Sequence, residues 1–83
     1  MNRIAIIQER LEKAFSPTHL EVIDDSARHK GHAGAAGGAG HYKIIITADC
    51  LQSLSRVDAH RRVYALFEDL IPNQIHALQI SIR

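Results

Sequence analysis

The chain has 83 residues, of which 46% are hydrophobic, and this is enough for one small globular domain over residues 1–83. The formal net charge of +1 does not predict the strong attraction to nucleic acid that a very basic domain shows. No apolar run approaches the roughly 20 residues that span a bilayer, and a single cysteine excludes an internal disulfide. We therefore expect a cytoplasmic domain without membrane association.

The first quarter of the chain predicts one helix and one strand. Apolar residues recur at steps of three and four between positions 4 and 15, as in an amphipathic helix, and a Ser-Pro pair ends the pattern. The stretch HLEVIDD (residues 19–25) alternates apolar and polar side chains, which is typical of a half-buried strand.

A glycine-rich loop follows, and it is the most unusual part of the sequence. HKGHAGAAGGAGHY (residues 29–42) carries His29, His32 and His41. Neutral imidazole binds zinc, iron and copper well. However, a flexible loop does not preorganise a metal, and a closed structural zinc site needs four ligands. The loop alone therefore does not predict a self-sufficient metal site, and a solvated loop with incidental histidines is the alternative.

The middle of the chain predicts a second strand and a short helical turn. HYKIIITA (residues 41–48) is rich in β-branched residues and places Tyr42, Ile44 and Ile46 on one face. DCLQSLS (residues 49–55) is short and mixed, and a helical turn fits it best.

A second long helix is predicted after this turn. Ser55 and Asp58 are spaced as in a capping box. Four apolar residues then recur with helical spacing and form the predicted inward face: Val63, Leu66, Phe67 and Leu70. A Pro-Asn pair at positions 72–73 ends the helix.

Two histidines in this half are predicted to have opposite environments. His60 lies off the apolar face of the second helix and should be exposed. QIHALQISIR (residues 74–83) is the predicted third strand, in which His76 alternates in phase with Leu78 and Ile80. This phase predicts a buried, hydrogen-bonded structural histidine.

The order helix, strand, strand, helix, strand predicts an α+β domain with a three-stranded sheet covered by helices on one face. Four blocks of this sequence resemble the BolA-like family: VIDDSARHKGHAG (22–34), GHYKIIITA (40–48), AHRRVYALFEDL (59–70) and IHALQI (75–80). The resemblance implies a class II KH-like fold of order α-β-β-α-α-β, in which the short helical turn is the additional helix.

The resemblance also implies a function. BolA-like proteins pair with monothiol glutaredoxins in iron–sulfur cluster handling, in which a helix histidine and a loop histidine or cysteine act as ligands. Carried over to this sequence, the helix ligand is His60 and the loop ligand is His29, with His32 as its rival. A [2Fe–2S] cluster needs four ligands, and the resemblance assigns the other two to the glutaredoxin cysteine and glutathione. No cofactor is then expected in the isolated protein.

A DNA-binding transcriptional regulator is the alternative that the resemblance leaves open. Arg56, Arg61 and Arg62 are its candidate nucleic-acid contacts. The low net charge is against it, and Ala59 stands where the family usually has an arginine. No motif predicts an independent enzyme, and the sequence leaves homo-oligomerisation open.

Overall fold

The computed structural model of the chain describes residues 3–25 and 40–83. The two candidate loop ligands, His29 and His32, lie outside these residues. The described elements, in chain order, are α1 (Arg3–Phe15), β1 (His19–Asp24), β2 (Gly40–Thr47), α3 (Asp49–Gln52), α4 (Arg56–Ala65) and β3 (Ile75–Ile82). None of the helices in the described ranges is both long and apolar enough to cross a bilayer.

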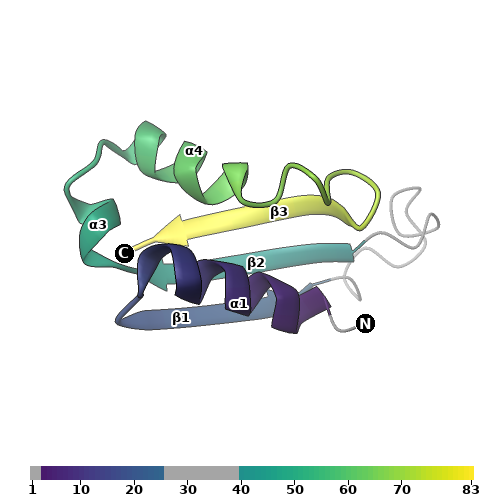
Figure 1. Ribbon diagram of the computed structural model, residues 1–83. Helices are drawn as coiled ribbons and strands as arrows, with labels where there is room; N and C mark the ends of the chain where they lie inside the picture. The colour runs from purple at the N-terminus through teal and green to yellow at the C-terminus, as the bar shows by residue number, and fades with distance from the viewer. Residues whose placement is uncertain (1–2, 26–39) are drawn as a thin grey trace.

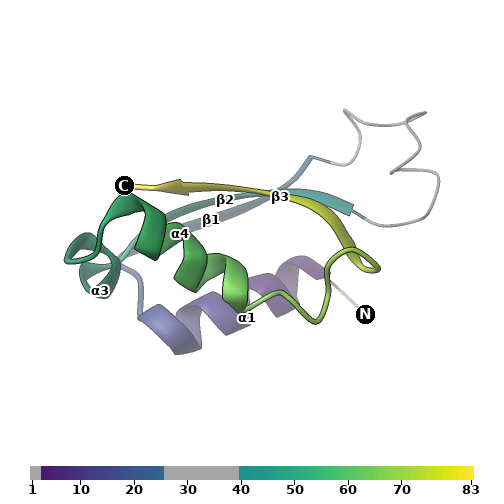
Figure 2. The same ribbon diagram turned by 90° about the horizontal axis from the view of Figure 1, so that it is seen from above.

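The three strands form one mixed sheet in the order β1-β2-β3. The central strand β2 runs antiparallel to β1 and parallel to β3. Figure 2 shows the helices together on one face of this sheet, and in Figure 1 α1 lies in front of β1 and β2 while α4 runs beside β3. The predicted α+β architecture with helices on one face is therefore confirmed.

The core lies between the helix layer and the covered face of the sheet. The predicted inward residues of β2 are all buried there, namely Tyr42, Ile44 and Ile46. The largest fully buried side chains come from both the helix layer and the sheet: Phe67, Ile7, Leu11, Ile44, Ile46, Leu51, Ile75 and Val63. Because this core draws on both halves of the sequence, neither half has a complete core of its own.

Local signals set two helix boundaries as predicted. α1 ends at Phe15, because Ser16 adopts a left-handed backbone with φ of 45° and Pro17 follows it. At the start of α4, the Ser55 hydroxyl accepts a hydrogen bond of 3.1 Å from the backbone N–H of Asp58. This bond satisfies one of the free donors of the first helical turn.

α4 is shorter than the sequence predicts. It ends at Ala65, whereas the apolar spacing predicted a helix up to Pro72. The backbone N–H groups of Leu66 and Phe67 donate to carbonyls three residues earlier, at 3.2 and 3.0 Å, so the chain continues in tighter turns. Phe67 is fully buried as predicted, but Leu66 is only half-buried.

The prediction that His76 is buried is wrong, because its side chain is exposed. The parallel pairing of β2 with β3 shifts register at this point: Gly40 pairs with Ile75, but His41 pairs with Ala77. Such a bulge adds one residue to β3 and changes the phase of the strand. Ile75 therefore takes the buried position that the alternation assigned to His76.

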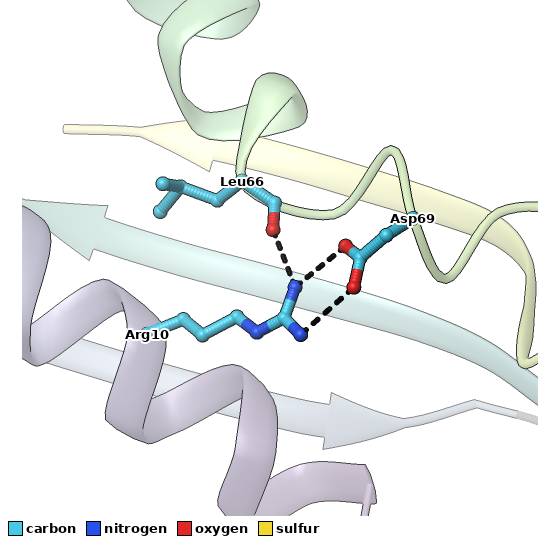
Figure 3. Close-up of polar contacts among 3 residues, drawn as sticks. All are labelled: Arg10, Leu66 and Asp69. Atoms are coloured by element: carbon cyan, nitrogen blue, oxygen red, sulfur yellow. Dashed lines mark hydrogen bonds and ion pairs between the residues drawn. The ribbon is translucent and has the colours of Figure 1, made fainter.

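Arg10 of α1 forms hydrogen bonds with the turn that follows α4. Its Nη1 donates to the carbonyl oxygen of Leu66 at 2.7 Å, and its two terminal nitrogens contact the two carboxylate oxygens of Asp69 at 2.7 and 3.0 Å (Figure 3). The hydrogen bond from the Arg10 guanidinium is the main cause that lowers the pKa of the Asp69 carboxyl below its ordinary value.

This pair predicts a specific pH dependence of stability. The folded pKa of Asp69 lies below the unfolded one, so the contribution of the pair is present above the unfolded pKa and is lost as the pH falls through the folded one. We expect the difference in free energy of unfolding between the wild type and Asp69→Asn to be largest well above the ordinary aspartate pKa of about 3.9 and to shrink as the pH falls below it. Urea denaturation at each pH measures it.

Both side chains are partly exposed, so the difference should be small and should fall as salt increases. Glu68→Gln, at the neighbouring position, controls for the loss of one negative charge. A difference between the wild type and Asp69→Asn that grows in acid contradicts the prediction.

Candidate functional site

His60 occupies a defined place between α4 and β3. The sequence predicted an exposed side chain, and this prediction is wrong, because the residue is half-buried. Its Nδ1 lies 2.9 Å from the carbonyl oxygen of Arg56, one turn earlier in α4, and its Nε2 lies 3.0 Å from the carbonyl oxygen of Ile80 on β3. The imidazole therefore connects the helix to the strand.

Both ring nitrogens of His60 thus face carbonyl oxygens. A neutral imidazole has one N–H and can donate to only one of these carbonyls. A metal ion needs an accessible lone pair on the other nitrogen, and in this orientation a carbonyl oxygen stands in front of it. His60 can act as a ligand only after its ring turns away from at least one of the two oxygens.

A second histidine site lies at the start of β3. The ring centroids of His41 and His76 are 5.0 Å apart, and the rings are tilted by 52°. His41 is 8% exposed, whereas His76 is exposed. The parallel pairing of β2 with β3 brings these two rings together, although the residues are far apart in the sequence.

The His41–His76 pair lies at the end of the sheet where the described chain stops and resumes. The backbone N–H of Asp25 donates to the carbonyl oxygen of His41 at 2.7 Å, and Gly40 pairs with Ile75. Residues 25 and 40 flank the segment that contains the two loop histidines. The histidine pair is therefore adjacent to both anchors of that segment.

His60 is further from these anchors. Its partner Ile80 lies five residues beyond Ile75 along β3, which corresponds to about 16 Å at the usual rise of a strand. His76, in contrast, directly follows Ile75, which pairs with Gly40.

The three candidate nucleic-acid contacts are all exposed on α4. Successive residues of an α-helix are rotated by about 100°, so Arg61 and Arg62 point about 140° and 120° away from Arg56, in opposite senses. The three guanidinium groups therefore leave the helix in different directions and do not form a single basic face. Arg56 instead lines a separate hollow with residues of α3 and the end of β3.

Sequence reasoning missed the His41–His76 pair. The sequence places His41 where the loop meets the second strand and predicts His76 in the core, so it does not bring the two residues together. The signal that could have found the pair is the distribution of histidines around the loop, since His29 and His32 lie within it and His41 directly after it. The pairing of the third strand with the second, which adds His76, is not visible in the sequence.

Comparison with known proteins agrees with this architecture. The family model described as BolA-like protein matches residues 11–83. The BolA domain of SufE1 from Arabidopsis thaliana superimposes with a TM-score of 0.85 at 36% sequence identity, covering 100% of this chain and 92% of that chain.

Two curated relatives give similar matches. The DNA-binding transcriptional regulator BolA of Escherichia coli strain K12 is 32% identical over 74 residues, which cover 89% of this chain and 68% of that protein. SufE-like protein 1, chloroplastic/mitochondrial, of Arabidopsis thaliana is 42% identical over 79 residues, covering 89% of this chain but only 21% of the longer relative. By its sequence over residues 11–83 and by its fold, the chain belongs to the BolA-like family.

Proposed function

We propose that this chain is an iron–sulfur cluster adaptor that pairs with a monothiol glutaredoxin and supplies imidazole ligands to a shared [2Fe–2S] cluster. The observation that supports this proposal most is the exposed His76 beside His41, at the sheet end that anchors the histidine-bearing loop. In this role the chain binds and presents the cluster as cargo and catalyses no reaction itself. The cytoplasm stays the predicted compartment.

The ligand count explains why a partner is needed. Within residues 3–25 and 40–83, no group of three or more histidine, cysteine, aspartate or glutamate side chains could hold a metal ion. A [2Fe–2S] cluster takes four ligands, and imidazoles can replace cysteine thiolates on one of its irons. Two imidazoles from this chain therefore leave two positions, which a glutaredoxin cysteine and glutathione would fill.

The geometry favours His76 as the ligand from the folded part of the chain, with His29 or His32 as the ligand from the loop. His76 is exposed and lies beside the anchors of that loop. The sequence-based choice of His60, with His29 as its partner and His32 as the rival, stays a competing prediction. It requires the His60 ring to release one of its two carbonyl contacts.

The experiment that tests the proposal is anaerobic reconstitution. This protein is mixed with a monothiol glutaredoxin carrying its glutathione-bound cluster, and visible circular dichroism is recorded. We expect a new spectrum that saturates at one adaptor per glutaredoxin, because the ligand set of the iron changes. A spectrum equal to that of the glutaredoxin alone, at every ratio, contradicts the adaptor function.

A DNA-binding regulator is the second candidate, and the name of the Escherichia coli relative supports it. In this chain Arg56, Arg61 and Arg62 point in different directions from α4. This arrangement limits the number of phosphate contacts that the three residues can make with one duplex. A charge of +1 adds little long-range attraction. We therefore expect only weak, non-specific binding, with a Kd of about 10⁻⁴ to 10⁻⁶ M.

Salt dependence measures this contribution directly. If Arg61 and Arg62 each contact a phosphate, the double variant Arg61→Gln/Arg62→Gln should reduce the slope of log Kd against log salt by about two. Lys13→Gln on α1 serves as the control and should leave the slope unchanged. A submicromolar complex with one DNA sequence at physiological salt would make the regulator the better hypothesis.

A further inference from the structure

The outer edge of β3 carries backbone groups that point away from the sheet. The backbone N–H of Arg83 donates to the carbonyl oxygen of Ile46 on β2 at 2.9 Å. Backbone groups alternate sides along a strand, so those of Ile82, Ile80 and Leu78 point away from β2. The contact of His60 Nε2 with the carbonyl oxygen of Ile80, from the α4 side, agrees with this alternation.

A groove runs between this edge and α4. Its volume is about 520 Å³, which lies in the range of about 300–1,000 Å³ typical of ligand pockets. Leu78 and Ile80 line it on the strand side, and Tyr64 and Ala65 line it on the helix side. Tyr64 is 42% exposed, so an aromatic ring contributes accessible apolar surface to the groove. Figure 1 shows α4 running alongside the outer edge of β3.

The two charged residues of the groove have opposite signs. Both line the groove: Arg61 lies on α4, and Glu68 lies seven positions later, in the turns that follow α4, with Tyr64 between them in the sequence. An occupant is complementary when it places an acidic group near Arg61, a basic group near Glu68 and apolar groups between them. A nucleic-acid backbone carries only negative charge, so Glu68 would oppose it.

We propose that this groove binds an extended peptide segment, which adds to β3 as a fourth strand beneath α4. The segment has an apolar centre and one acidic and one basic residue, placed for Arg61 and Glu68. Main-chain hydrogen bonds to the outward groups of β3 provide affinity, and the groove provides side-chain selectivity. His60 already occupies the Ile80 carbonyl, and a peptide N–H would replace it there. The proposal does not rest on cluster binding.

The first test is an NMR titration of the ¹⁵N-labelled protein. The probe is a capped nine-residue peptide that alternates valine and threonine and carries a glutamate near one end and a lysine near the other, in both sequence orders. We expect the largest amide shifts and slowed hydrogen exchange at Leu78, Ile80 and Ile82. Shifts confined to the opposite edge strand β1, or none with either peptide at millimolar concentration, overturn the proposal.

A proline substitution tests the strand addition itself. Ile80→Pro removes an N–H that points into the groove and not towards β2, and an edge strand tolerates such a change. Val22→Pro is the matched control on the outer edge of β1. The backbone N–H of Asp25 faces β2, and because backbone groups alternate along the strand, the N–H of Val22 faces away from β2. We expect Ile80→Pro to weaken peptide binding by at least about tenfold and Val22→Pro to leave it unchanged. Equal effects overturn the proposal.

A charge exchange keeps the proposal testable if Ile80→Pro does not fold. The double variant Arg61→Glu/Glu68→Arg should prefer a peptide with its glutamate and lysine exchanged, by about tenfold relative to the wild type. An unchanged preference overturns the proposal. The proposal is also overturned if a single-stranded oligonucleotide shifts the same amide signals and neither peptide does. In that case the groove would be a nucleic-acid site.

Discussion

Replacing Phe67 with alanine should remove a large share of the stability of this domain. The Phe67 side chain has no exposed surface and packs in the cluster that joins the helix layer to the sheet. Truncating a buried phenylalanine costs about 3–5 kcal/mol, because transfer free energy is lost and a cavity remains. At about 0.05–0.15 kcal/mol per residue, a chain of 83 residues has roughly 4–12 kcal/mol in total.

Urea denaturation followed by far-ultraviolet circular dichroism measures this loss. Leu66→Ala is the matched control at the neighbouring position, where the side chain is half-buried, and it should cost clearly less. His60→Ala should cost about 0.5–1.5 kcal/mol, the usual net value of the hydrogen bond that it removes between α4 and β3. If either control destabilises the domain as much as Phe67→Ala, the assignment of the buried face is wrong.

The fold could be predicted from the sequence wherever a local signal determined it. Ser16 and Pro17 end α1, and the Ser55 hydroxyl caps α4, because each acts on its own backbone neighbours. The end of α4 could not be found in the same way. Turns with bonds over three residues keep Leu66 and Phe67 near the same face as a continued α-helix, so the apolar spacing persists after Ala65.

The histidine environments depended on contacts between distant parts of the chain. The bulge at the start of β3 puts Ile75 inside and His76 outside, and nothing in the alternation of the strand marks the extra residue. His60 Nε2 contacts the backbone carbonyl oxygen of Ile80. A pattern of side chains in the sequence cannot identify a contact with a backbone group. The family resemblance identified the function class to propose, but only the sheet register brings His41 and His76 together.

The strongest functional prediction concerns the choice between His76 and His60. His76→Ala should abolish the new visible circular dichroism spectrum of the mixture with glutaredoxin and leave the spectrum of the glutaredoxin's own cluster intact. His60→Ala should retain the new spectrum, because both His60 nitrogens face carbonyl oxygens and the residue is distant from the loop anchors. His29→Ala and His32→Ala are then compared. The variant that weakens the new spectrum more identifies the second ligand.

A second readout separates loss of a ligand from loss of docking. Replacing thiolates by imidazoles makes the cluster less negative, which raises its reduction potential, as in clusters where two histidines replace two cysteines. The mixed cluster should therefore have a higher potential than the glutaredoxin's own cluster, and His76→Cys should restore a spectrum at a lower potential. A His76 variant that still binds glutaredoxin by size-exclusion chromatography but forms no mixed cluster has lost a ligand. If His60→Ala abolishes the spectrum and His76→Ala retains it, the helix histidine is the ligand, and its ring must leave the Ile80 carbonyl when the cluster binds.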